Sequence, residues 1–418
     1  MRYHQFLLRN GIAMKIGYIC YWDLSRHEAA TIHVFGIADN LSRMGHSVTV
    51  FAPNIGKYRQ STPTEVVYLP APFGQHYGRL LYNLSLFSSL AHYIHRHKPD
   101  CFYVRDISWL HAPWLLGRLC RIPTFLEVNG IWEAENPVCS PLSHPPRSLW
   151  NYFAHRVTAA ANSVSYRSHD YFLAVTPWIR DLLASRRGIS ADRIAVVPNG
   201  VDVGLYRPME KSEACRYVGL APDRPTIGFI GRFYQHQGVE NFISAAPHIV
   251  ARVPKVLFPI VGYGPLQNKY QLLVNEKGLT DSFLFTGYVD REQSVHWVNV
   301  LDIAFTLAFH MPQGFVAIKL FTYMACGKPV VATRTRGYTL LDEIGAGVTV
   351  PLEDPETIAE VFVRLLDDLD ARNRMGALGR KYVEENQTWR HHATVTARFL
   401  EDRAAEYRTK RRGLDGSH

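Results

Sequence analysis

The sequence lacks an apolar run long enough to span a bilayer, a metal-binding cysteine spacing and a dinucleotide fingerprint. Its apolar stretches are interrupted by Arg, Asn or His within about ten residues, whereas a membrane-spanning helix needs about 20 apolar residues. Its six cysteines include no C-x-x-C pair, which favours reduced thiols in a cytosolic protein. The loop 21–31, after the first predicted strand, has no G-x-G-x-x-G, so nicotinamide dinucleotide binding is not expected.

Acidic charge is scarce in the N-terminal half. Residues 1–200 hold 20 Lys and Arg against 12 Asp and Glu, and residues 201–418 hold 26 against 25, so the net charge of +9 belongs almost entirely to the first half. This basicity indicates either a solvated surface or a face toward an anionic partner, such as a membrane or a phosphorylated carrier. Because no basic run with interleaved aromatic residues is present, we expect no nucleic-acid binding.

The order of the predicted elements indicates two α/β domains. A chain of 418 residues with 47% hydrophobic residues can form two packed cores. Buried strands alternate with helices from residue 15 onward, which is typical of parallel sheets covered on both faces. The predicted divisions are an N-terminal extension (1–13), a first domain (14–202), a charged connection (203–224), a second domain (225–388) and a C-terminal helix with a basic tail (389–418).

The stretch 313–333 is the most informative one, with the sequence QGFVAIKLFTYMACGKPVVAT. It predicts a turn, an amphipathic helix over 316–325, a Gly-Lys-Pro break and a buried strand over 330–332. In an open α/β sheet, this order presents a helix N-terminus to a ligand, and its backbone N–H groups favour anions. The start of this helix is therefore a candidate anion site.

Polar residues also follow predicted strands of the first domain. Arg105 comes after the strand 101–104, and Glu127 and Asn129 lie at the end of the strand 124–128. Ligands of open parallel sheets meet the carboxyl ends of the strands, so these residues are candidates for a binding cleft. For Arg105, an ion pair with the adjacent Asp106 or with a loop carboxylate is an equally good interpretation.

Five motifs follow one another in the order and spacing of a known family. They are VVPNGVD (196–202), FIGRF with QGVENFI (229–243), PIVGYGP (259–265), FTGYV (285–289) and KLFTYMACGKPVVAT (319–333). With YVRD and LEVNG in the first half, the series resembles family 4 retaining glycosyltransferases of the GT-B fold over about residues 15–389. The resemblance implies two Rossmann-like doubly wound domains facing each other across a cleft, with the sugar nucleotide on the C-terminal domain and the acceptor mainly on the N-terminal one.

The resemblance also assigns roles to individual residues. Arg232 corresponds to a diphosphate-binding arginine, and the departure of a nucleoside diphosphate requires fixed cations and amide donors at the phosphate. The candidate catalytic residues are Asn129, Arg232 and Lys319. The candidate donor-binding residues are Gly231, Arg232, Gln237, Gly262, Gly264, Gln313, Gly314, Phe315, Lys319, Leu320 and Thr322. The candidate acceptor-side residues are Arg105, Glu127, Asn129 and Glu133.

The expected activity is sugar transfer from a UDP- or GDP-linked sugar to a glycan, a lipid-linked sugar or another glycoconjugate. The resemblance implies no cofactor and no essential metal, because side chains and the helix end supply the positive charge. The expected partners are therefore the sugar nucleotide and the acceptor. The expected location is the cytoplasm, with peripheral contact at the inner face of an anionic membrane as the sharper interpretation of the basic half.

Four positions depart from the family pattern. Gln237 stands where a lysine is usual, Thr322 where a ribose-binding glutamate is usual, and Gly314 where the earlier acidic partner is expected. Asn129 takes the place of a histidine of the N-terminal domain. These departures keep a GT-B protein that binds without transferring sugar open as an alternative, whereas the motif order argues against a sugar-nucleotide epimerase.

Three nearby residues are candidates to supply the missing positive charge: Lys319, His236 and His310. Lys319 precedes Thr322 by three residues, so the two side chains would share one face of the predicted helix. For both histidines, an ordinary polar loop position is the more economical interpretation.

Overall fold

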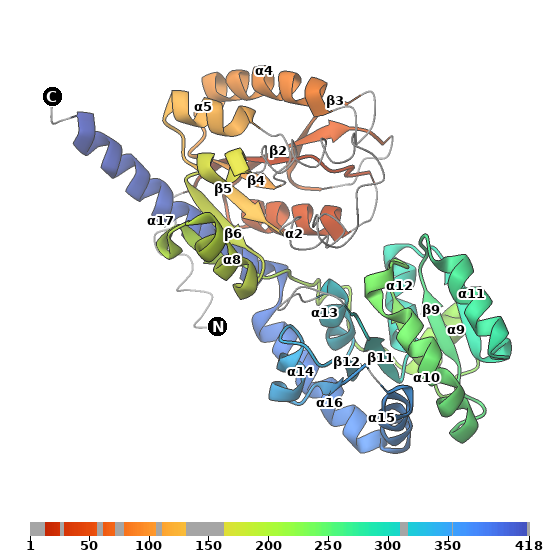
Figure 1. Cartoon of the computed structure of the whole chain (residues 1–418). Coiled ribbons are helices and arrows are strands. Elements are labelled where there is room, and N and C mark those ends of the chain that lie inside the picture. Colours follow the sequence, from red (N-terminus) through yellow and green to blue (C-terminus); the bar gives the residue numbers. More distant parts are fainter. Residues whose placement is uncertain are drawn as a thin grey trace, which may run out of the picture. The chain divides into compact units, whose positions relative to one another are not determined.

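The computed structural model describes residues 13–25, 29–56, 62–71, 79–105, 111–130, 163–309, 317–352 and 354–415, which separate into two compact units (Figure 1). Unit 1 takes its residues from 1–199 and 389–418, and unit 2 from 200–388. Each unit is a parallel sheet with helices on both faces, which confirms the predicted α/β class with two Rossmann-like domains. Among the described helices, none is both long and apolar enough to cross a membrane.

Unit 1 contains a seven-stranded sheet in the order β3-β2-β1-β4-β5-β6-β7. Its strands are β1 (Lys15–Cys20), β2 (Ser47–Asn54), β3 (Glu65–Pro70), β4 (Cys101–Arg105), β5 (Thr124–Val128), β6 (Tyr171–Ala174) and β7 (Ile194–Val196). Helices α4 (Arg79–His97), α5 (Ala112–Cys120) and α8 (Pro177–Arg187) cover one face. Helices α2 (Ala29–Arg43) and α17 (Trp389–Asp415) cover the other. The C-terminal helix therefore belongs to the core of unit 1.

The strand register of unit 1 brings Arg105 and Glu127 together. Tyr18 pairs with Tyr103 in the middle of the neighbouring strands β1 and β4. Two residues further on, Arg105 of β4 pairs with Glu127 of β5. Because side chains two residues apart point to the same face of a sheet, these side chains all lie on the face that α2 and α17 cover.

Unit 2 contains a six-stranded sheet in the order β10-β9-β8-β11-β12-β13. Its strands are β8 (Ile227–Ile230), β9 (Phe258–Val261), β10 (Phe283–Gly287), β11 (Ile303–Thr306), β12 (Val330–Thr333) and β13 (Gly347–Val350). Helices α10 (Val239–Arg252), α11 (Gln267–Glu276) and α15 (Pro355–Asp367) share one core cluster. The second core cluster of unit 2 is lined by helices α12 (Arg291–Val300), α13 (Ile318–Ala325), α14 (Thr339–Ile344) and α16 (Leu369–Asn386). Helix α9 (Lys211–Val218) packs against α12.

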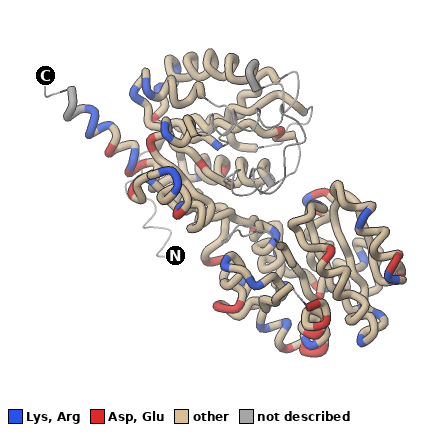
Figure 2. Tube along the Cα trace, viewed as in Figure 1, with Lys and Arg blue, Asp and Glu red and all other residues tan. Residues whose placement is uncertain are grey.

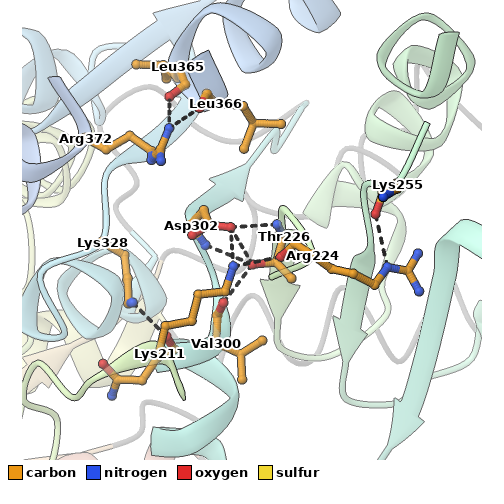
Figure 3. Close-up of polar contacts among 11 residues, drawn as sticks. Lys211, Arg224, Thr226, Lys255, Val300, Asp302, Lys328, Leu365, Leu366 and Arg372 are labelled. Atoms are coloured by element: carbon orange, nitrogen blue, oxygen red, sulfur yellow. Dashed lines mark hydrogen bonds and ion pairs between the residues drawn. The ribbon is translucent and has the colours of Figure 1, made fainter. Parts of the chain in front are cut away.

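Half-buried lysines form polar contacts at the amino-terminal ends of the unit 2 strands (Figure 3). Lys211 Nζ lies 2.6 Å from the Asp302 carboxylate, which also accepts the backbone N–H of Thr226 at 2.8 Å. Lys328 Nζ donates to the carbonyl oxygen of Asn299 at 2.8 Å, and burial lowers its pKa to about 8. These contacts stabilise the edge of the sheet where the strands begin, so the charges of Lys211 and Lys328 serve the fold.

Short-range sequence features set the helix ends. Thr176 accepts the backbone N–H of Ile179 at 3.2 Å, and Pro177 takes the first helical position, so α8 begins as the Thr-Pro pair predicts. Asp290 and Gln293 form a reciprocal capping box at the start of α12. These two helices therefore start where a side chain replaces the missing backbone partner.

Candidate functional site

The candidate donor residues of unit 2 gather where the strand order reverses, between β8 and β11. Strand β8 leads into Gly231 and Arg232, and a 3-10 turn, Gln235–Gln237, follows. Helix α13, which lies between β11 and β12 in the sequence, carries Lys319. Open α/β sheets bind ligands at this point, beyond the carboxyl ends of the strands.

Gly262 and Gly264 allow the loop after β9 to touch the loop after β8. Gly262 has a φ of +122°, and a Cβ atom there would lie 2.0 Å from the carbonyl oxygen of Gly231. A Cβ atom at Gly264 would lie 2.6 Å from the backbone nitrogen of Phe233. Glycine is the residue that permits such close backbone approach, so these two positions build the floor of the site.

Lys319 lies in the first turn of α13 and reaches back to the end of β8. Its ammonium donates to the side-chain oxygen of Gln237 and lies 3.7 Å from the centroid of the Phe229 ring. A Cβ atom at Gly231 would lie 2.7 Å from Lys319 Nζ, so the glycine leaves room for the ammonium. Burial lowers the pKa of Lys319 well below its ordinary value. The structure thus brings three predicted donor residues together around one cation.

Gln237 connects Lys319 to His236. The Gln237 side-chain nitrogen lies 2.7 Å from His236 Nε2. Burial, and then the charge of Lys319, lower the pKa of His236. A role of His236 toward a diphosphate stays a prediction. His310 lies outside the described residues.

Arg232 is held by tyrosines at the same edge of the sheet. Its guanidinium carbon lies 4.2 Å from the centroid of the Tyr263 ring, and Nη2 donates to the Tyr234 hydroxyl at 3.4 Å. Tyr288, an exposed residue, meets Tyr263 edge to face with ring centroids 5.6 Å apart. The contact with the Tyr263 ring orients the guanidinium. Its N–H groups lie in the guanidinium plane, which is the arrangement that suits a bidentate anion.

Other predicted donor residues have different surroundings. The side chain of Leu320 is fully buried in the apolar core of unit 2, and its role toward a donor stays a prediction. Thr322 is also buried, and its hydroxyl donates to the carbonyl oxygen of Ile318 at 3.4 Å within its own helix. The remaining candidates lie outside the described residues: Gln313, Gly314 and Phe315.

The candidate acceptor residues of unit 1 form a buried cluster around the Glu127 carboxylate. Glu127 is 2% exposed and Arg105 7% exposed, and Arg105 Nη1 donates to Glu127 Oε1 at 2.5 Å. His33 Nε2 lies 2.7 Å from the same oxygen. Tyr103 and Tyr18 donate to Glu127 Oε2 at 2.6 Å and 3.3 Å. Within the described residues, Arg105 thus has Glu127 as its carboxylate partner.

The cluster holds an ionised carboxylate in a buried place. Burial raises the pKa of Glu127, but the neighbouring His33 and Arg105 and the hydrogen bond from Tyr103 outweigh burial and hold the pKa of Glu127 well below its usual range. Burial, and next Arg105, lower the pKa of His33. Burial and the Glu127 charge raise the pKa of Tyr103. The charges of Arg105 and Glu127 are balanced inside unit 1, and a role toward an acceptor stays a prediction.

Two residues of this cluster show what the sequence reasoning missed. His33 Nδ1 lies 2.7 Å from the Asn199 side-chain oxygen, and Asn199 belongs to the VVPNGVD motif, which could have identified it. His33 follows no strand end and carries no motif, so nothing in the sequence pattern pointed to it. Asn129 is half-buried just after β5, and Glu133 lies outside the described residues. In the described part of the chain, no group of three or more His, Cys, Asp or Glu side chains could hold a metal ion.

Comparison with protein families gives one match for each half of the chain. Residues 30–205 match the model of Glycosyltransferase Family 4, and residues 224–368 match that of Glycosyl transferases group 1. The D-inositol 3-phosphate glycosyltransferase 2 of Catenulispora acidiphila is 32% identical over 333 residues, which span 75% of this chain and 74% of that protein. The 2-deoxystreptamine N-acetyl-D-glucosaminyltransferase of Streptomyces fradiae is 28% identical, over 63% of this chain and 62% of the relative.

Solved structures share the fold along nearly the whole chain. The sucrose-phosphate synthase of Thermosynechococcus elongatus superposes with a TM-score of 0.73 at 18% identity, covering 94% of this chain and 100% of the other. HepE of Anabaena, solved in complex with UDP and glucose, superposes with a TM-score of 0.71 at 18% identity, covering 93% of this chain and 99% of the other. At such low identity the likeness supports the GT-B fold and nothing finer.

Proposed function

The chain belongs to glycosyltransferase family 4, and we propose that it transfers a sugar with retention, and without a metal, from a nucleotide diphosphate sugar to a glycan, lipid-linked or other glycoconjugate acceptor. The observation that carries the proposal is the pair of cations at the switch point of unit 2. The Arg232 guanidinium lies over the Tyr263 ring, and the half-buried Lys319 donates to the neutral Gln237. Two fixed cations beyond the carboxyl ends of β8 and β11 suit a diphosphate.

The proposed mechanism assigns each group a part in the departure of the nucleoside diphosphate. Negative charge grows on the β-phosphate as the glycosidic bond breaks, so cations that are already in place stabilise the transition state more than the ground state. Arg232 and Lys319 supply this charge, with backbone amides of Gly314 and Phe315 beside Gln313 as further donors. A leaving-group oxygen takes the proton of the acceptor hydroxyl, so the reaction needs no strong protein base.

The acceptor is proposed to bind unit 1, with Asn129 and Glu133 as contact residues. Arg105 and Glu127 support the strand ends next to Asn129 from within, because their charges are paired and buried. The structure of HepE in complex with UDP and glucose supports a sugar nucleotide as co-substrate. We propose UDP or GDP as the nucleotide, and a cytoplasmic protein with peripheral membrane contact.

The test measures binding and transfer separately. The purified protein is titrated with UDP, GDP and their sugars, and release of the nucleoside diphosphate is followed with and without candidate acceptors. Arg232→Ala should weaken nucleotide binding strongly, whereas Arg216→Ala, which changes an exposed arginine of α9, should leave binding unchanged. Equal effects of the two substitutions would contradict the assigned site. Binding without release for every acceptor would favour a protein that binds but does not transfer.

A further inference from the structure

Helices α4 and α5 form an outer surface of unit 1 that carries no acidic residue. The two helices contact each other and cover the same face of the sheet (Figure 1). No Asp or Glu occurs in residues 66–99 or 107–126, and Figure 2 shows no red segment on either helix. Because most helical surfaces mix charges of both signs, a surface without acidic residues indicates a defined partner.

Large apolar side chains are exposed on this surface. Those of α4 are Leu81, Leu84 and Phe87, and those of α5 are Leu115 and Leu119. Leu84 is 63% exposed and Leu119 68% exposed. Elsewhere in the described part of unit 1, Val164 is the one large apolar side chain that is exposed. The exposed apolar area of unit 1 is therefore concentrated on two adjacent helices, as is typical of an interaction surface.

Both helices end in cations. Arg96 and Lys98 are exposed at the end of α4, and Arg118 is exposed in the last turn of α5. The acidic residues that flank α4 and its preceding strand in the sequence are Glu65 and Asp100. Asp100 pairs with Arg408 at 2.7 Å, whereas Glu65, which accepts the hydroxyl of Thr49 at 2.8 Å, lines the same pocket as Arg96. Within the described residues, no ion pair joins an acidic side chain to Arg96, Lys98 or Arg118.

We propose that this α4–α5 face docks unit 1 on the surface of an anionic lipid bilayer. Leucine and phenylalanine side chains would enter the boundary between headgroups and acyl chains, and the adjacent arginine and lysine side chains would contact lipid phosphates. Charge complementarity selects this partner, because the half-chain that contains the face carries 20 basic against 12 acidic residues. Two copies of the face would repel each other, which argues against self-association. The proposal does not depend on which sugar the protein transfers.

The experiment uses the full chain and sedimentation with vesicles. One set of vesicles contains phosphatidylcholine alone, and the other contains phosphatidylcholine with phosphatidylglycerol. The charge variant is Arg96→Gln with Arg118→Gln, and the apolar variant is Leu84→Ser with Leu119→Ser. The control is Leu272→Ser with Lys277→Gln on and just after α11 of unit 2, where Leu272 is 61% exposed. Far-ultraviolet circular dichroism and nucleotide binding are measured on every variant.

The wild-type chain should bind the anionic vesicles and lose binding as salt rises. Each removed arginine should weaken partition about five-fold, so the charge variant should bind roughly 30-fold more weakly. The apolar variant should bind at least about ten-fold more weakly, and the control should bind like the wild type. Nucleotide binding should not change in any variant, so a failure of the membrane proposal can be told apart from a failure of the proposed activity.

The proposal would be overturned by any of three results. These are no binding of the wild-type chain to anionic vesicles, an equal loss of vesicle binding in the control, or a wild-type dimer that the apolar variant dissociates.

Discussion

Lys319→Met is expected to weaken sugar-nucleotide binding and to stabilise the free protein at the same time. The Lys319 ammonium contacts the Gln237 amide and the Phe229 ring, and burial lowers its pKa well below the ordinary value. Among the described residues the partners of this half-buried cation are neutral, so it destabilises the ligand-free fold, because the groups around it replace only part of its hydration. A diphosphate supplies the missing negative charge.

The expected magnitudes follow from this arrangement. Loss of one charge-assisted hydrogen bond costs about 1.5–3 kcal/mol, so the dissociation constant of the nucleotide should rise roughly 10- to 150-fold. Methionine has a similar length and suits the Phe229 ring, so the free energy of unfolding should rise by about 1 kcal/mol or more. The pKa of Lys319 is lower in the folded than in the unfolded state. The destabilisation of the fold by Lys319 is therefore absent above the unfolded pKa, near pH 10, and grows as the pH falls.

Gln237→Glu tests the same reasoning with the lysine in place. A carboxylate beside Lys319 would raise the pKa of the ammonium and neutralise its charge, so this isosteric substitution should also weaken binding. In the wild type, nucleotide binding should take up a proton, because the bound diphosphate raises the lowered pKa of Lys319. Affinity should therefore fall as the pH rises through that window, and both variants should flatten this dependence.

The assay combines calorimetric titration with UDP and GDP at several pH values and urea unfolding of the free protein. Lys277→Met, at an exposed lysine after α11, is the matched control and should change neither quantity. Unchanged affinity in Lys319→Met would refute the assignment of Lys319 to the donor. Tighter binding in Gln237→Glu would refute the electrostatic argument, even if Lys319→Met weakened binding.

Three further predictions concern stability. Burial lowers the pKa of His169 to about 4 and of His392 to about 3, so the unfolded chain takes up protons before the folded protein does as the pH falls. The free energy of unfolding should therefore fall by about 2 kcal/mol per histidine between pH 6.5 and pH 5, and a flat urea-unfolding profile over this range would contradict this prediction. Glu127→Gln leaves a buried arginine without its carboxylate and should cost about 3–5 kcal/mol in urea unfolding, whereas a loss below about 1 kcal/mol would contradict the buried pair. Gly262→Ala should destabilise the protein by more than about 2 kcal/mol, because its Cβ would meet backbone at 2.0 Å, while Gly278→Ala, with positive φ but open space, should cost about 1 kcal/mol in the same thermal unfolding assay.

The sheets could be predicted because buried parallel strands have a strong local pattern. The apolar runs 15–20, 124–128 and 283–287 coincide with β1, β5 and β10, since each is bounded by a turn or a charged residue. The strand β3 escaped prediction because it lies at the edge of the sheet and its residues are only partly buried. Local pattern therefore identifies the centre of a sheet better than its edge.

The buried cluster of unit 1 could not be predicted in the same way. Arg105 and Glu127 were candidates because they end neighbouring strands, and the register pairs them. That Glu127 also receives His33 from α2 depends on how the helix packs, which the strand pattern does not contain. Burial then decides the interpretation, because the charges of Arg105 and Glu127 balance each other and support the fold from within. Lys319 has no carboxylate partner among the described residues, which is why its role toward a ligand stays a prediction.

The departures from the family pattern in unit 2 are related through Lys319. A glutamate in place of Thr322 would lie one turn from Lys319 in the same helix, and residues three apart in a helix interact. Such a carboxylate would reduce the positive charge that α13 presents at its first turn. In the structure, Thr322 is bonded to its own helix and the neutral Gln237 is the partner of the Lys319 ammonium. We therefore propose that the replaced glutamate and the replaced lysine belong to one diphosphate site, in which Lys319 would supply the charge missing at Gln237.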